Sequence, residues 1–254
     1  MTLTSANDVR SRVSSEEWEA RVQLAAAYRL MAHYGVNDLS YNHLSMRVPG
    51  QPDQFLVKPS QWMFEEVTAS GLYKFSFDGR PHQDSPPCGG GQLVIHAGVL
   101  NKRSDLNVVF HTHTTANTGV SAQKMGLRML SQHAMGFYNR VAYHTFGGFE
   151  FNVDQREPLL RDLGDHRYAM LRNHGVLVCG ANVPQTFVDH HYLEMACRAQ
   201  IAALSGGVEV TEIPPEVCER AAQQYQTIDP KRAGGKDWPG CLRLLERLYP
   251  DYKS

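Results

Sequence analysis

The chain of 254 residues predicts a single α/β domain with a sheet that is at least partly antiparallel. A helix near the N-terminus is followed closely by short segments in which apolar and polar residues alternate, as in strands with one buried face. Further segments of helical and strand character follow, and no repeat, low-complexity tract or linker divides them. We therefore expect one domain over residues 14–254, with a helical C-terminal tail, after a flexible lead at residues 1–13.

The first helix is predicted to begin at a capping box, with Ser14 as the N-cap and Glu17 three residues later. It should end near Gly35, because glycine suits the left-handed position after a helix. Strands are expected around residues 44–48, 55–57 and 72–77, where apolar side chains gather between turn residues. Several β segments packed close after one helix indicate antiparallel pairing.

The later elements follow from the same periodicities. A glycine-rich loop at Ser85–Gly91 precedes a predicted helix at Gln92–Leu100, and an apolar strand from Val108 leads into His-Thr-His. The remaining expectations, in chain order, are a helix within 115–135, an extended segment at 138–151, a helix at 157–163, a hairpin at 168–180 with His174 at its bend, a helix from Gln185 to Leu204 with Pro184 at its first position, and helices at 215–226 and 242–248.

Composition excludes several classes of protein. The net charge is −1, so nothing indicates a nucleic-acid partner. No apolar run is long enough for a membrane span, and the N-terminus lacks the pattern of a secretory signal. Five scattered cysteines without a C-x-x-C pair are typical of reduced thiols. We expect a cytoplasmic protein with a small-molecule substrate.

His111 and His113 end the apolar strand and, at a spacing of two, point to one face of it. The alternative interpretation of the pair is two partly solvated polar residues at a strand exit. His174, at a turn between two apolar segments, supplies a third imidazole. Three histidines suit a catalytic site that leaves one coordination position open, and neutral imidazole accepts zinc, iron, manganese or nickel.

His-Thr-His followed by Arg-Asn-His-Gly before an apolar strand resembles the class II aldolase/adducin family, from about Trp18 to Leu204. The resemblance implies an α/β/α sandwich around a mixed, largely antiparallel sheet. It also implies a homotetramer with sites between subunits. In the sugar-phosphate aldolases of this family, the residues matching His111, His113 and His174 bind zinc. We therefore expect a divalent metal there, with zinc favoured and manganese or iron as alternatives.

Two departures from the family pattern bear on chemistry. Gln92 stands where the aldolases have a glutamate that acts as acid and base, and an amide cannot take up a proton near neutral pH. Gly90 and Gly91 stand where the aldolases hold the substrate phosphate with two serines. His43 replaces an assisting asparagine, whereas Ser60 resembles a further phosphate contact. The glycine N–H groups could still bind an anion.

Other candidates have two interpretations each. His43 either contacts a substrate carboxylate or is a surface or supporting histidine. His133 either faces the substrate pocket or packs in the core or an interface. Tyr252 resembles a tyrosine that family aldolases supply from a neighbouring subunit, or belongs to a mobile tail. His190 and Glu194 have i, i+4 spacing, which an exposed helix pair would explain.

The sequence therefore predicts a metal-dependent lyase that decarboxylates or aldol-cleaves a small oxo-acid or hydroxy-carbonyl compound without an essential phosphate. Gln92 favours decarboxylation, because loss of CO2 does not require a base to deprotonate a hydroxyl. An Fe(II)-dependent oxygenase and a non-catalytic, adducin-like binding protein are the alternatives. The metal content of the purified protein distinguishes them.

Overall fold

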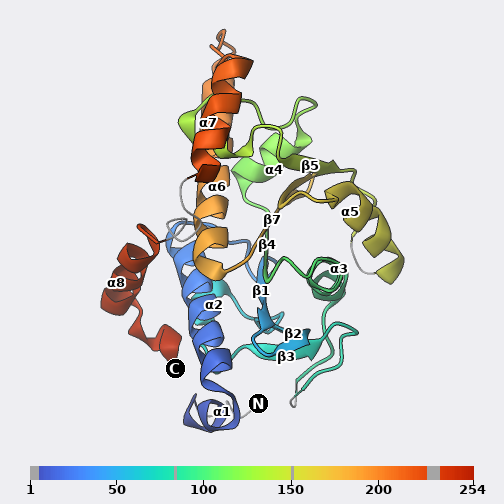
Figure 1. The fold of residues 1–254 in the computed structure, drawn as a ribbon, viewed down its shortest axis with the longest axis vertical. Coiled ribbons are helices and arrows are strands. Elements are labelled where there is room, and N and C mark those ends of the chain that lie inside the picture. Colours follow the sequence, from blue (N-terminus) through green and yellow to red (C-terminus); the bar gives the residue numbers. More distant parts are fainter. Residues whose placement is uncertain (1–5, 83–84, 150–151, 228–234) are drawn as a thin grey trace.

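The structure is a computed structural model that describes residues 6–82, 85–149, 152–227 and 235–254. Its described strands form one seven-stranded sheet in the order β3-β2-β1-β4-β7-β6-β5 (Figure 1). The strands are β1 His43–Val48, β2 Gln51–Val57, β3 Tyr73–Ser76, β4 Val108–Thr112, β5 Val141–His144, β6 Tyr168–Leu171 and β7 Gly175–Gly180. Only β5 and β6 pair in parallel among them, so the sheet is mixed and largely antiparallel, as expected.

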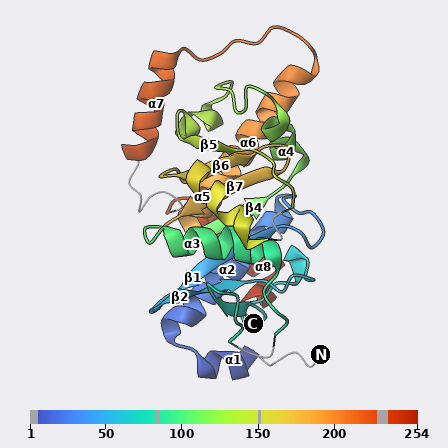
Figure 2. The same cartoon turned by 90° about the vertical axis from the view of Figure 1, so that its right-hand side faces the viewer.

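Helices cover both faces of the sheet, which gives the α/β/α sandwich. Helices α2, α6 and α8 pack on one face, and α3 and α5 lie over the other (Figures 1 and 2). Alternate residues of β4 supply the two layers, because Val108 and Phe110 join the first core and Val109 joins the second. The helices are α1 Ala6–Arg12, α2 Ser15–His33, α3 Gly98–Lys102, α4 Thr115–Ala122, α5 Arg156–Leu163, α6 Val183–Ser205, α7 Pro215–Thr227 and α8 Trp238–Leu248.

The start of α2 confirms one half of the predicted capping box. The Ser14 hydroxyl accepts a hydrogen bond from the Glu17 N–H at 3.1 Å. The return bond is not made, because the buried Glu17 carboxylate binds Arg21 at 3.0 Å and Lys74 at 2.9 Å instead. The expected lead contains the short helix α1, while residues 1–5 lie outside the described residues.

Three expected elements differ in kind or length. The helix predicted at Gln92–Leu100 begins with a π-helix, η2 (Gln92–Ala97), and continues as α3. The helix expected within 115–135 is present as α4 but is shorter than that range: it ends at Ala122, Gly126 adopts a left-handed φ of 65°, and a 3-10 helix, η3 (Gln132–Phe137), follows. The extended segment at 138–151 reduces to β5, and residues 150 and 151 lie outside the described residues.

The hairpin of β6 and β7 confirms the prediction around His174. Helix α6 begins one residue before Pro184, with Asn182 as its N-cap, and α8 begins at Trp238, four residues earlier than residue 242. Short 3-10 helices complete the fold at η1 Phe64–Glu66, η4 Val153–Gln155 and η5 Pro250–Lys253. Within the described ranges, no helix combines the length and the apolar character that crossing a bilayer requires.

Candidate metal centre

Strand β4 lies between β1 and β7 and carries His111 at its end. His111 shares the face of Val109, toward η2 and α3, and His113 follows just beyond the strand. Pairing of β4 with β7 brings the β6–β7 turn, and with it His174, beside this end of the strand. One nitrogen from each of the three histidines lies within 4.8 Å of the others. The structure thus brings together the three predicted ligands.

The residues around His174 explain the local sequence. Asn173 adopts a left-handed φ of 60°, which asparagine tolerates better than most residues. A Cβ at Gly175 would collide with the Thr112 carbonyl oxygen and lie 3.0 Å from the His113 Cβ. Only glycine therefore allows β7 to approach the end of β4 this closely, and the approach places His174 against His113.

Two of the imidazoles are oriented through Nδ1. His111 Nδ1 donates to the Val176 carbonyl at 3.0 Å, and His113 Nδ1 lies 2.6 Å from Asp38 Oδ2. The Asn42 side-chain oxygen accepts from the His113 backbone N–H at 3.0 Å and holds the chain there. These bonds leave the Nε2 lone pairs to bind a metal, which is the usual arrangement around metal-binding histidines.

The chemistry of this donor set fits a divalent cation. Burial, followed by the neighbouring His174, holds the pKa of His111 well below its usual value, so this ring stays neutral. Metal ligation requires the neutral form of imidazole. Three convergent imidazole nitrogens at the end of a rigid sheet suit zinc, with iron and manganese as alternatives.

A second histidine cluster lies beside the triad on the same face of the sheet. His43 pairs across the strands with His111, and its Nδ1 lies 2.6 Å from His96 Nε2. His96 Nδ1 in turn lies 2.5 Å from the Ser45 hydroxyl. Burial lowers the pKa of both His43 and His96 well below the usual value, so both rings are neutral. Ser45, His96 and His43 form a continuous hydrogen-bonded chain that ends next to the triad.

Sequence reasoning missed the roles of Ser45 and His96. Strand alternation could have indicated Ser45, which stands two residues after His43 and shares its face. The contact with His96 depends on how η2 packs on β1, and no local pattern encodes that.

Gln92 is buried, and backbone groups hold both ends of its amide. Its Nε2 donates to the Lys58 carbonyl and its Oε1 accepts from the Gly89 N–H, each at 3.2 Å. The side chain thereby fixes the loop before η2. A Cβ at Gly91 would lie 3.4 Å from His43 Nε2, so Gly91 and its neighbour Gly90 start the helix against the second cluster.

Lys58 is a buried cation that sequence reasoning also missed. Its Nζ donates to the Ser40 carbonyl at 2.7 Å, and burial lowers its pKa to about 8. The Ser60 carbonyl lies 3.4 Å from the same nitrogen, while the Ser60 hydroxyl is exposed and contacts Gln61. Its position in the sequence, between an apolar strand and a proline, could have indicated that this lysine is buried.

The structure does not bring two other candidates to the triad. His133 is exposed in η3 and packs on Tyr192 of α6, in the helical layer on the other face of the sheet. Tyr252 is not in a mobile tail, because its side chain is buried, its hydroxyl donates to Glu246, and its carbonyl accepts from the Ala69 N–H. This packing gives no support to a role for Tyr252 in a neighbouring site.

The expectation that His190 and Glu194 form an exposed helix pair was wrong. Both side chains are buried, because α6 packs this face against β4 and α4. His190 Nε2 lies 2.7 Å from the Thr112 hydroxyl, and the Glu194 carboxylate accepts from Thr114 at 2.8 Å. The two residues support, from behind, the strand that carries the candidate metal ligands.

An α/β/α sandwich in which two histidines at the end of the central strand meet a third from the β6–β7 turn defines a class of domain with a candidate metal site. The family described as Class II Aldolase and Adducin N-terminal domain matches residues 22–201, and the chain belongs to this family. A Pseudomonas aeruginosa protein, provisionally named an aldolase class 2 protein, is 39% identical over 97% of this chain and 96% of its own length.

Two further comparisons describe the range of the family. The crystal structure of an aldolase II superfamily protein from Pseudomonas syringae has a TM-score of 0.92 and 42% identity, and covers 97% of this chain and 99% of its own. Alpha-adducin from Rattus norvegicus is 33% identical over 80% of this chain but only 29% of its own length. The family therefore includes proteins named for aldolases and proteins named for adducin.

Proposed function

We propose that this chain is a metal-dependent lyase that decarboxylates or aldol-cleaves a small oxo-acid or hydroxy-carbonyl compound without an essential phosphate. The observation that carries the proposal is the convergence of His111, His113 and His174, with two of the rings oriented through Nδ1. A divalent cation held by them, with zinc favoured, would act as a Lewis acid that stabilises enolate charge.

The residues beside the triad suit an anionic substrate. Gly90 and Gly91 begin a helix, where backbone N–H groups point outward and favour negative charge. The buried ammonium of Lys58 adds positive charge to the region near His43. We assign these three residues to the binding of a substrate carboxylate. The exposed Ser60 hydroxyl remains a proposed contact for the distal end of the substrate.

Gln92 cannot transfer a proton, so His43 is the side chain that we assign to proton transfer at the substrate. Its Nδ1 is bound to His96, which leaves Nε2 facing the start of η2 at Gly91. Ser45 and His96 fix the orientation of the ring. Decarboxylation fits this arrangement better than aldol cleavage, because it needs no base to deprotonate a hydroxyl.

The proposal includes assembly as a homotetramer, as the resemblance to the class II aldolases implies. His133 lies in the helical layer opposite the triad, so it could reach a site only in a neighbouring subunit. The mass of the protein in solution, measured by light scattering, tests the assembly. If the protein is a monomer in solution, His133 cannot belong to the site.

The function is tested with purified protein whose bound metal has been determined by elemental analysis. A panel of β-oxo acids and hydroxy acids is assayed for release of CO2 and of aldehyde. We expect turnover with wild type and a loss of at least about a hundredfold in His113→Ala, because the metal ligands are incomplete. No turnover by the metal-loaded protein on any substrate would contradict the proposal.

A non-catalytic binding role is the second candidate, and the similarity to alpha-adducin favours it. Gln92 is consistent with this role, because the usual acid and base is replaced. The Gln92→Glu variant distinguishes the two candidates. In a lyase the added carboxylate changes the rate or the reaction, whereas in a binding protein both forms remain inactive on the whole panel.

A further inference from the structure

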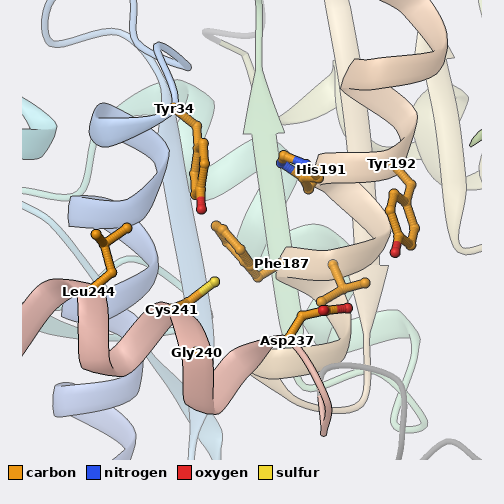
Figure 3. Close-up of a pocket in the computed structure, with 9 residues that line it drawn as sticks. Tyr34, Phe187, His191, Tyr192, Asp237, Gly240, Cys241 and Leu244 are labelled. Carbon is orange, nitrogen blue, oxygen red and sulfur yellow. The ribbon is translucent and has the colours of Figure 1, made fainter.

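A cavity lies in the helical layer, on the face of the sheet opposite to His111. It has a volume of about 340 Å³ and opens between the end of α2, the first half of α6 and the start of α8 (Figure 3). Its lining includes Tyr34, Phe187, His191 and Tyr192, together with Asp237. The volume falls at the lower end of the range for small-molecule sites. A compact ligand fits better than a peptide.

Four aromatic rings line this cavity. The Tyr34 ring lies 5.2 Å from the His191 ring and 6.3 Å from the Phe187 ring, and Tyr192 follows on α6 (Figure 3). Phe187 is anchored from behind by Trp238 at 5.6 Å. Aromatic faces carry negative electrostatic potential and attract cations within about 6 Å of the ring centre. Burial lowers the pKa of His191, so this ring adds no positive charge.

Asp237 adds a full negative charge to the cavity. It is the N-cap residue of α8, where an aspartate usually accepts a bond from its own helix, yet its side chain makes no capping bond. Among the described residues Asp237 forms no ion pair, and Arg198 on α6 is bound by Glu194 at 2.8 Å. After burial, the Asp237 charge is a further cause of the raised pKa of Tyr34 and Tyr192.

The start of α8 has a partial positive charge that would favour an anion. That charge is about half a unit, whereas the Asp237 carboxylate carries a full unit of opposite sign. The aromatic faces also repel an anion. The net electrostatic preference of the cavity is therefore for a cation.

We propose that this cavity binds a small organic cation with a primary or quaternary ammonium group, which lies against the rings of Tyr34 and Phe187 and pairs with Asp237. The site is separate from the histidine triad and does not depend on the lyase activity. The chain would then bind a second ligand, between the end of α2, the first half of α6 and the start of α8.

The test uses the full-length protein and three probes measured by calorimetry: choline, its neutral isostere 3,3-dimethyl-1-butanol, and inorganic phosphate. We expect choline to bind at least about tenfold more tightly than the neutral alcohol, because only the charge differs. Phosphate should not compete. Equal binding of the alcohol, displacement of choline by phosphate, or no binding of choline would each overturn the proposal.

Variants locate the bound cation. Asp237→Asn and Tyr34→Leu should each weaken choline binding about fivefold to tenfold, because they remove the charge and one aromatic wall. Asp154→Asn, an exposed carboxylate in η4, is the matched control and should bind choline like wild type. Thermal unfolding checks that all variants are folded. Wild-type affinity in both cavity variants would place the cation elsewhere and overturn the proposal.

Discussion

Two clusters of histidine lie side by side on one face of the sheet and differ in what their nitrogens bind. In the triad, His111 and His113 give Nδ1 to a carbonyl and a carboxylate, which are fixed acceptors. In the second cluster, His43 and His96 bind each other and a serine hydroxyl. Fixed acceptors set one tautomer and leave Nε2 for a metal, whereas partners that both donate and accept allow either tautomer.

Residue type alone therefore does not show whether a histidine binds a metal. All of these rings lie at one end of β1, β4 and their neighbours, and burial keeps His43, His96 and His111 neutral. What distinguishes the two clusters is whether the partner behind each ring is a fixed acceptor or a group that both donates and accepts. Four substitutions test this contrast.

The largest effect is expected from His174→Ala, which leaves only two ligands. Zinc affinity, measured by competition with a chelator, should fall by more than the roughly 10–100-fold that supporting residues contribute. His144→Ala removes a histidine from β5 and serves as the control. Unchanged affinity in His174→Ala would show that the triad does not hold the metal.

Asp38→Asn should weaken zinc binding by about 10–100-fold, because His113 loses the carboxylate that sets its tautomer. The chain offers a matched control in Asp162→Asn, since Asp162 Oδ2 lies 2.7 Å from His144 Nδ1 in a similar pair. That variant should bind zinc like wild type. Equal losses in both would indicate a general effect of lost charge.

Ser45→Ala should act on the second cluster alone. Removing the hydroxyl leaves the buried His96 Nδ1 without its partner, which costs about 1–3 kcal/mol in the free energy of unfolding. Zinc affinity should not change. Urea unfolding measures the stability, and chelator competition measures the zinc affinity. A drop in zinc affinity equal to that of Asp38→Asn would show that the two clusters act as a single site.

His190→Leu sharpens the comparison through pH. Burial lowers the pKa of His190 to about 3, so between pH 6.5 and 3 the unfolded chain binds a proton that the folded chain does not. The free energy of unfolding therefore falls as the pH falls, by about 1.4 kcal/mol per unit for this residue. Replacing it with leucine should flatten the slope by that amount between pH 5.5 and 4.5, measured by urea unfolding. An unchanged slope would mean that His190 is protonated in the folded chain.

The sequence predicted the triad more completely than the rest of the site, and the reason is physical. His111 and His113 follow from strand alternation, and His174 from turn residues, so local patterns place them. His96, Lys58 and the buried side of α6 depend on packing between segments far apart in the chain. Local patterns carry no information about such contacts.

The same limit explains errors in the fold. The helix expected within 115–135 stops early, because the chain turns at Gly126, where a Cβ would meet the Tyr143 side chain. Trp238, Pro239 and Gly240 look like loop residues, yet Trp238 packs on Phe187 and starts α8. Tertiary packing overrides local preference at both places.

The central place of β4 has a consequence for how the chain folds. Of the three candidate ligands, only His111 and His113 lie close together in the unfolded chain, since His174 arrives when β7 pairs with β4. His111 and Val176, which mark that pairing, stand 65 positions apart. Closing so long a loop is slow, so tight zinc binding should appear late in refolding. Its appearance would therefore report when β4 pairs with β7. Zinc would then slow unfolding more than it accelerates folding.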